Sequence, residues 1–180
     1  AWTSSHGNFA QFLVNPFPFT GDVLPIARRN VLLQFPYCEN LQTRRECGSL
    51  MWYAIFRHGY DYCWTSQAVR YYELSPTGLS GAEYLTKFPA EMVICNEHVL
   101  AKFGQDILAV SKPLYLSMRQ KTAFYCIMDS RPGKALTHLW KAAQSAPLNP
   151  RTILMVPLCF GGARLARNLY KIIKERAAGF

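Results

Sequence analysis

Apolar residues recur at helical spacing along much of the chain. Within 106–120 the apolar positions are Ile107, Val110, Leu114, Tyr115 and Met118. Their spacing of 3, 4, 1 and 3 residues places them on one face of an α-helix. No segment shows the alternation of apolar and polar residues that is typical of a half-buried strand. The pattern therefore predicts an all-α fold built mainly from antiparallel helix pairs.

Capping residues, prolines and glycines predict where these helices begin and end. We expect helices over 22–35, 40–58, 62–74, 90–103, 106–120, 122–128, 134–145, 151–160 and 163–178. One further helical turn fits between 78 and 89. Gly104 and the pair Gly161-Gly162 are expected to separate helices, and Pro113 is expected to kink or locally open the helix that contains it.

Residues 1–21 are predicted to form an extended segment ahead of a single helical domain over 22–180. Asn15-Pro16 and Phe17-Pro18 disfavour helix, because the residue before a proline is pushed into extended geometry. The segment is nevertheless too apolar for a solvated tail, so we expect it to lie along the domain or along a partner. Its candidate docking residues are Trp2, Phe9, Phe12, Phe17 and Phe19.

The positive charge of the chain is concentrated in its last part. Residues 1–111 carry a net charge of −1, and residues 112–180 carry +10. Such a field favours an acidic partner, which can be a nucleic acid, an anionic lipid or an acidic protein face; the alternative is a solvated surface. The longest uncharged runs, 7–21 and 152–163, are short and interrupted by prolines, so no membrane-spanning helix is predicted.

The six cysteines show neither the C-x-x-C pattern nor His residues at metal-ligand spacing. Most lie inside apolar runs, which favours buried free thiols and a reducing compartment. The first residue is Ala1, as expected of a mature form that has lost a targeting segment or of part of a longer chain. Hydrolase, metalloprotease, P-loop and dinucleotide-binding motifs are absent, so no catalytic residue, metal or cofactor is predicted.

Two segments repeat the same plan. Residues 92–121 and 151–179 each have an apolar helix, a glycine break, and a second helix with Leu-Tyr followed three residues later by Met or Ile. Less regular copies give predicted units of about 48–75, 91–121, 122–146 and 150–180. Because one helix pair cannot bury its apolar face, such units stack on their neighbours. The alternative is an irregular helical bundle.

These units resemble pentatricopeptide repeats, which are helix-turn-helix units of ~35 residues related in plan to the tetratricopeptide unit. The resemblance covers about 48–180 and is degenerate, since the aromatic markers Tyr72, Tyr115, Trp140 and Tyr170 are 43, 25 and 30 residues apart. It implies that Asn96 occupies the base-reading position. The implied repeat-core residues are Leu114, Tyr115, Met118, Leu139, Trp140, Ala166, Leu169 and Tyr170.

In size and in its worn repeats, the chain is similar to the pentatricopeptide-like accessory subunits that decorate the F1 head of mitochondrial ATP synthase in euglenozoan protists. This resemblance implies a non-catalytic structural subunit in the mitochondrial matrix that contacts F1 alpha- and beta-type subunits. The alternative is an RNA-binding pentatricopeptide or mitochondrial ribosomal protein. In either case, phosphates or acidic partners would meet the basic C-terminal residues Arg164, Arg167, Lys171, Lys174 and Arg176.

Overall fold

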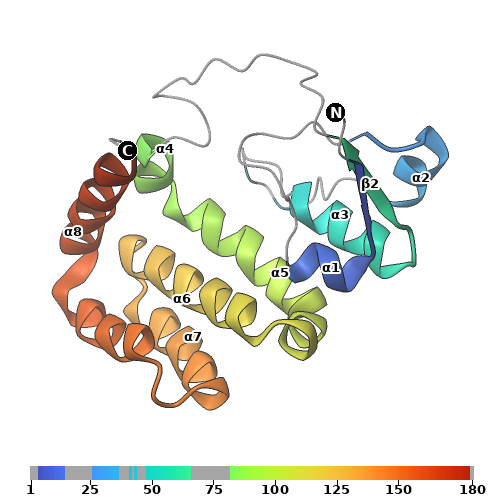
Figure 1. Cartoon of the computed structure of the whole chain (residues 1–180). Coiled ribbons are helices and arrows are strands. Elements are labelled where there is room, and N and C mark those ends of the chain that lie inside the picture. Colours follow the sequence, from blue (N-terminus) through green and yellow to red (C-terminus); the bar gives the residue numbers. More distant parts are fainter. Residues whose placement is uncertain are drawn as a thin grey trace.

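The fold is helical, with one small two-stranded sheet near the N-terminus. A computed structural model describes residues 4–14, 26–36, 41, 43, 48–65 and 82–178. Within these residues the strands are β1 (Ser4–Gly7) and β2 (Tyr62–Thr65). The helices are α1 (Phe9–Val14), α2 (Arg29–Gln34), α3 (Gly48–Arg57), α4 (Ala82–Lys87), α5 (Pro89–Val110), α6 (Lys112–Met128), α7 (Pro132–Ser145) and α8 (Pro150–Ala178). The predicted all-α class is confirmed (Figure 1).

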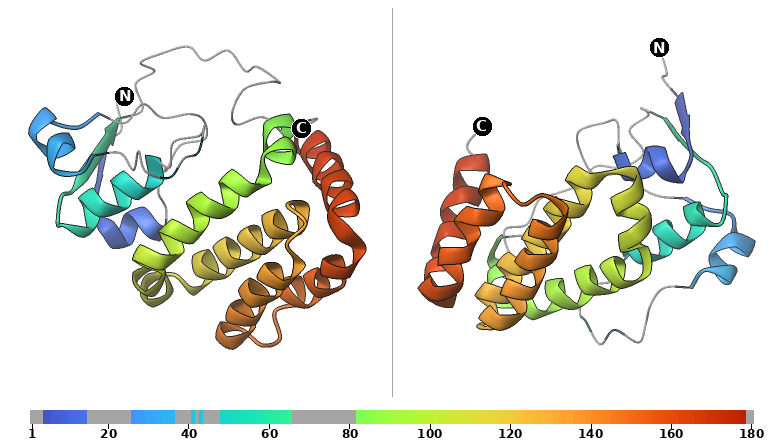
Figure 2. Two further views of the ribbon diagram at one scale, coloured as in Figure 1. Left: turned by 180° about the vertical axis from the view of Figure 1, so that it is seen from behind. Right: turned by 90° about the horizontal axis from the view of Figure 1, so that it is seen from below.

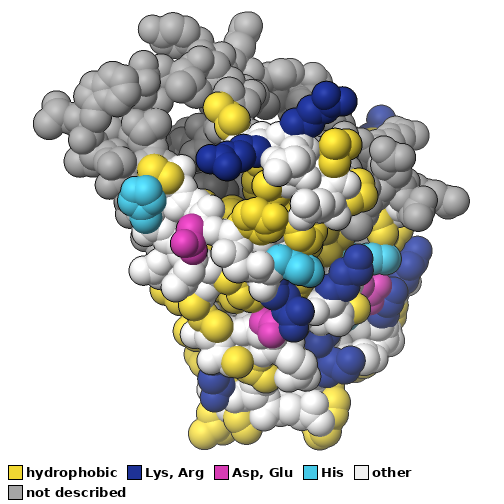
Figure 3. Space-filling view, turned by 90° about the vertical axis from the view of Figure 1, so that its right-hand side faces the viewer, with side chains coloured by type: hydrophobic (Ala, Val, Ile, Leu, Met, Phe, Trp, Pro, Cys, Tyr) yellow, Lys and Arg dark blue, Asp and Glu magenta, His cyan; other side chains and the backbone are white. Residues whose placement is uncertain are grey.

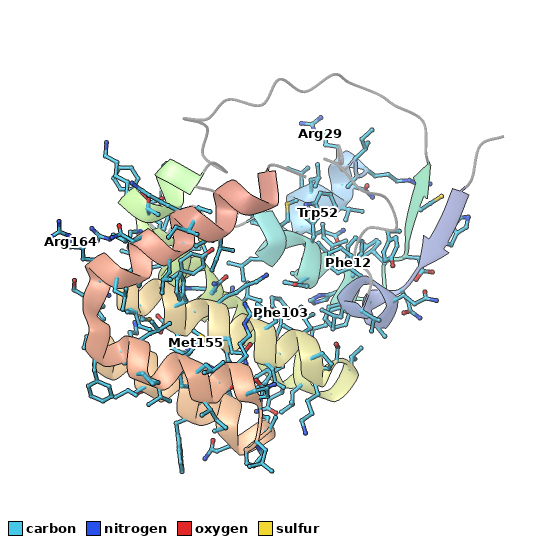
Figure 4. All side chains as sticks on the ribbon, turned by 60° about the vertical axis from the view of Figure 1, so that its left-hand side comes forward. Phe12, Arg29, Trp52, Phe103, Met155 and Arg164 are labelled. Atoms are coloured by element: carbon cyan, nitrogen blue, oxygen red, sulfur yellow. The ribbon has the colours of Figure 1, made fainter. Side chains whose placement is uncertain are left out.

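The four longest helices form a C-terminal stack. Helix α6 lies at its centre and packs against α5, α7 and α8, while α4 packs against α8 (Figures 1 and 2). Met155 lies inside this stack (Figure 4). Burying an aliphatic side chain of this size stabilises a fold by about 1.5–3 kcal/mol. The other buried residues of this core are Val93, Ala123, Tyr125, Cys126, Ile127, Met128, Ala135, Leu139, Cys159 and Ala166.

The boundary between α5 and α6 corrects two sequence predictions. Helix α5 continues through Gly104 to Val110, and α6 begins after Ser111, whose Oγ accepts a hydrogen bond of 3.3 Å from the backbone N–H of Leu114. Pro113 therefore lies in the first turn of α6, where its missing N–H removes no helical hydrogen bond. The predicted break at Gly104 was therefore wrong, whereas the predicted single helix over 106–120 is interrupted at Ser111, two residues before Pro113.

After α6, the observed helix ends agree better with those predicted from the sequence. The turn after Met128 precedes a helix that starts at Pro132 and ends at Ser145, as predicted within two residues. The predicted short helix over 122–128 is the last part of α6. Helix α8 changes direction at Gly162, whose φ of 79° and ψ of 169° are not helical. Its two parts diverge instead of forming the predicted antiparallel pair (Figure 1).

The N-terminal part of the fold contains the only sheet that the described residues form. Strands β1 and β2 pair antiparallel, with Ser4 opposite Thr65 and Gly7 opposite Tyr62. The predicted helix over 62–74 was therefore wrong at 62–65, where Tyr, Trp and Thr favour strand. Helix α3 ends as predicted at His58-Gly59, and Gly59 has a φ of 87°. Residues 66–81 lie outside the described part.

Helix α1 joins the N-terminal part to the stack. Phe12 is buried against Tyr53, Phe56 and Tyr62, at ring-centroid distances of 5.5, 4.6 and 5.8 Å. Leu13 packs into a second cluster with Phe103 of α5. Figure 4 shows Phe103 between the N-terminal helices and the stack. The described residues of the predicted extension are thus a strand and a helix that belong to the chain's own core.

The cysteines follow the prediction in part. Cys126 and Cys159 are buried free thiols, and burial raises the pKa of Cys126 to about 12, with a smaller contribution from the nearby Glu97. Cys95, also predicted to be a free thiol, is disulfide-bonded, and its partner is not among the described residues. As for membrane spans, none of the described helices combines the length and the apolar character that crossing a bilayer requires.

Candidate functional site: an exposed surface on α7 and α8

Exposed apolar side chains gather on α7 and on the first part of α8. Trp140 is 67% exposed, Ile153 53% and Phe160 79%. Leu136 and Trp140 lie four residues apart on α7, and Ile153, Val156 and Phe160 follow helical spacing on α8, so each set forms one stripe. Soluble proteins rarely leave a continuous apolar surface open, and such surfaces commonly mark interaction sites.

Leu136 and Trp140 of the first stripe and Ile153 and Val156 of the second border a groove of about 310 Å³ between the helices. The residues that line it are Leu136, Leu139, Trp140, Ala143, Pro147, Thr152, Ile153 and Val156. The connection between α7 and α8 spans only residues 146–149, so the two packed helices run antiparallel. The result is an open apolar channel along the helix pair.

A hydrogen-bonded cap fixes the start of α8 beside this groove. The Oδ1 atom of Asn149 accepts from the backbone N–H of Thr152 at 3.1 Å and from Nε2 of Gln120 at 2.9 Å. Gln120 also donates to Oγ1 of Thr152 at 2.9 Å. Because Gln120 and Thr152 are buried, these bonds hold α8 on α6 in one register. These bonds therefore fix the α8 wall of the groove relative to α6.

A polar network lies on the other side of α7 and connects three helices. Glu97 of α5 accepts from Nζ of Lys134 at 2.7 Å and from Nε2 of His138 at 3.1 Å, both on α7. Arg119 of α6 completes the network, since its Nη1 lies 3.3 Å from Nδ1 of His138 and its Nε donates to the Tyr115 hydroxyl at 3.0 Å. The guanidinium also lies over the Tyr115 ring.

The network defines the protonation state of His138. Arginine can only donate, so Nδ1 of His138 accepts from Arg119, and Nε2–H donates to Glu97. Burial lowers the pKa of His138, and the Arg119 charge adds to this effect while Glu97 opposes it. Burial favours a higher pKa for Glu97, but the hydrogen bonds from Lys134 and His138 outweigh it and lower that pKa. Both ring nitrogens of the neutral imidazole are occupied by structural contacts.

Acid is expected to destabilise the fold through His138. Because its pKa is held below the ordinary value of 6.5, the unfolded chain binds a proton first as the pH falls through that value. The free energy of unfolding, measured by denaturant titration, should then fall by up to about 1.4 kcal/mol per pH unit. His138→Gln should remove this part of the slope and His98→Gln should keep it; an unchanged slope in His138→Gln would contradict the assignment.

A second hollow, of about 340 Å³, opens beside the network. Arg119, Lys134 and Lys141 line it together with Glu97, which is already bonded to Lys134. Figure 3 shows one face of the molecule, on which Lys and Arg side chains lie among exposed hydrophobic side chains and a few Asp, Glu and His side chains. The outward side of α7 thus has an apolar groove on one flank and a basic hollow on the other.

The basic residues predicted on α8 have different environments. Arg164 is exposed and projects away from the stack (Figure 4). Arg167 instead donates through Nε and Nη2 to the carbonyl of Met128, at 3.1 and 2.7 Å, and so caps the end of α6. Lys171 is exposed, whereas the side chains of Lys174 and Arg176 lie outside the described part.

The predicted repeat-core residues are buried or half-buried, with one exception. Tyr115, Leu139 and Ala166 are buried, and Leu114, Met118, Leu169 and Tyr170 are half-buried. Trp140 was assigned to the core, but it points outward because consecutive helical residues differ by about 100° and Leu139 faces the core. The repeat arrangement itself stays a prediction.

The other predicted site residues are divided between the core, the surface and the undescribed segments. Asn96 is half-buried on α5, directly before Glu97. Of the aromatic docking residues, Phe9 is half-buried and Phe12 is buried in the chain's own core. Trp2, Phe17 and Phe19 lie outside the described residues.

Sequence reasoning missed the network, because its bonds between helices join residues 19 to 41 positions apart that carry no local motif. The described residues contain no group of three or more His, Cys, Asp or Glu side chains arranged to hold a metal ion. No family model, curated protein or solved structure matches the chain. The case for function therefore depends on the exposed surface of α7 and α8.

Proposed function

We propose that the chain is a non-catalytic accessory subunit that docks on protein subunits of a larger assembly through α7 and α8. The observation that carries this proposal is the exposure of Trp140 and Ile153 on the walls of one groove, with Phe160 exposed further along the α8 stripe. Aromatic residues exposed beside an apolar groove are typical of the centres of protein interfaces. The tightly bonded network behind α7 supports the same role, because it gives the docking surface a rigid base.

The pentatricopeptide resemblance gives the proposal a specific form. It favours an assembly in the mitochondrial matrix, with the F1 catalytic head and its alpha- and beta-type subunits as the partner. Stacked helix pairs offer extended surfaces that commonly bind proteins. The exposed α7–α8 surface is what such a subunit would use to dock.

An RNA-binding function is the second candidate, and the exposed cations Arg164 and Lys171 favour it. Their contacts with phosphates would be independent of sequence and sensitive to salt. Arg167 contributes less to this candidate, since its guanidinium is bonded to the Met128 carbonyl. Asn96 is half-buried beside an ion-paired Glu97, which leaves little room for reading bases.

Native electrophoresis after nuclease treatment separates the two functions. We expect the protein, extracted from cells that express it naturally, to migrate with a large complex whether or not nuclease is added. Trp140→Ala should release it from the complex, and Leu33→Ala, which alters an equally exposed side chain on α2, should not.

Release by nuclease would overturn the docking proposal. The RNA function would then predict retention of single-stranded RNA at ~50 mM salt that is lost on the double substitution of Arg164 and Lys171 by Ala. Arg167 is left unchanged in this arm, because its substitution would remove a cap of α6.

A further inference from the structure

We infer that the α7–α8 groove receives one amphipathic helix of a partner protein, with acidic residues along the edge of that helix that faces α7. The inference rests on the proposed function and specifies the chemistry of the partner. The shape of the groove and the charge on one side of it carry the argument.

The shape of the groove fits a helix. Its walls are two antiparallel helices that each present apolar side chains at helical spacing. The stripe from Ile153 to Phe160 spans eight residues, which is seven steps or about 10 Å of helix at 1.5 Å per residue, and its first two members line the groove. A guest helix of two to three turns would bury anchors at positions i, i+3 or i+4, and i+7 in such a channel. Trp140 would then be the central aromatic contact.

The charge on α7 determines which kind of partner helix the groove can bind. Lys141 follows Trp140 directly, so it projects about 100° further around the helix, from the groove wall toward the basic hollow. It is exposed and has no ion-pair partner among the described residues. Arg119 lines the same hollow as Lys141. Its Nε and Nη1 are bonded within the network, and the N–H groups of Nη2 can donate to another acceptor.

Helix α7 and the part of α8 up to Lys174 carry no negative charge that could balance these cations. Between Ser130 and Lys174 the sequence contains no Asp or Glu. Glu97 is the acidic residue that lines the hollow, and it is already bonded to Lys134 and His138. A guest that fills the groove and covers α7 would therefore place one edge in a field of net positive charge. Glu or Asp residues on that edge would pair with Lys141 and Arg119, whereas a basic or neutral helix would leave both without a counter-charge.

The same charges disfavour a second copy of this chain as the occupant. A symmetric dimer brings equivalent surfaces together, so Lys141 of one copy would approach the cations of the other. A lipid surface fits less well, because helices that bind membranes present a convex apolar face. The apolar residues here instead line a channel with two walls.

Site-specific photo-crosslinking tests the inference in the full-length protein. Benzoylphenylalanine is placed at position 153 in the groove wall, the protein is irradiated in cells that express it naturally, and the crosslinked peptide is sequenced by mass spectrometry. We expect one segment of a partner protein with apolar residues at helical spacing and Asp or Glu on one flank. Trp140→Ser and Lys141→Glu should each lower the crosslinking yield about 10-fold or more.

Matched controls use exposed residues on other parts of the surface. Arg164→Glu makes the same charge change on the second part of α8, and Leu33→Ser removes an exposed apolar side chain on α2; both should keep the yield within about twofold. Circular dichroism should show unchanged helix content in all four variants, because each replaced side chain is exposed.

The possible results separate this inference from the proposed function. Crosslinks to lipid, to RNA, to a second copy or to a protein segment without acidic residues would overturn the inference, as would the absence of any crosslink in a protein that still migrates with the complex. A crosslink to a protein segment without acidic residues would leave docking through α7 and α8 in place, and the other results would leave only an accessory role in the complex. Failure to migrate with any complex would overturn the proposed function and the inference together.

Discussion

Replacing Leu139 by Ala is expected to lower the free energy of unfolding by about 2–5 kcal/mol. Leu139 is 2% exposed and belongs to the core formed with Met128 and Met155. Truncation would remove buried contacts and leave a cavity that the packed helices fill only in part. Equilibrium unfolding in urea, followed by circular dichroism, measures the change.

The adjacent residue provides the matched control. Trp140→Ala removes a larger side chain, but that side chain is 67% exposed, so we expect a loss within about 1 kcal/mol. The two variants therefore separate stability from docking: Leu139→Ala should weaken the fold, and Trp140→Ala should weaken assembly. Comparable losses of stability would mean that α7 is rotated relative to the stack, and the groove would then not exist as described.

The sequence predicted the class of the fold and its sharpest boundaries. The periodicity of apolar residues predicted the helices, because a helix in a stack must bury one face. The turn before Pro132 and the end of α3 at Gly59 were predictable, since proline and positive-φ glycine restrict the backbone locally. These signals depend on neighbouring residues alone.

Where a local signal had two meanings, tertiary packing decided between them. Gly104 was interpreted as a break, but a single glycine costs only about 1 kcal/mol inside a helix. Here it is buried in the middle of α5, where a methyl group added to it would lie 3.8 Å from the Tyr115 ring, at ordinary contact distance, so the site does not interrupt the helix. Ser111 and Pro113 are the actual boundary signals, as an N-cap and a first-turn proline.

The candidate site was predictable only in part. Trp140 was selected from the sequence, but as a core residue, because a helical stripe does not show which face of an outer helix is covered. The bonds of His138 to Glu97 and Arg119 arise only when α5, α6 and α7 are packed together. The exposed stripe on α8 becomes a groove wall only beside α7. These features depend on contacts between elements, which a single sequence does not specify.

Replacing Gly162 by Ala is expected to cost about 1–3 kcal/mol of unfolding free energy, although no atom lies within 4 Å of the added methyl group. The cost arises from the backbone, because a φ of 79° with a ψ of 169° is almost confined to glycine. The strain would favour a straighter α8 and so weaken its packing against α4.

Gly133→Ala is the control for this substitution, because Gly133 is helical in α7 and an added methyl group would also meet no atom within 4 Å. There the same change should stabilise the protein by up to about 1 kcal/mol through reduced freedom of the unfolded chain. Urea unfolding of both variants compares the two signs directly. If Gly162→Ala proved as stabilising as Gly133→Ala, α8 would be a continuous helix in solution. Its second part, with Arg164 and Lys171, would then extend away from the stack, and the RNA-binding alternative would gain a free basic helix.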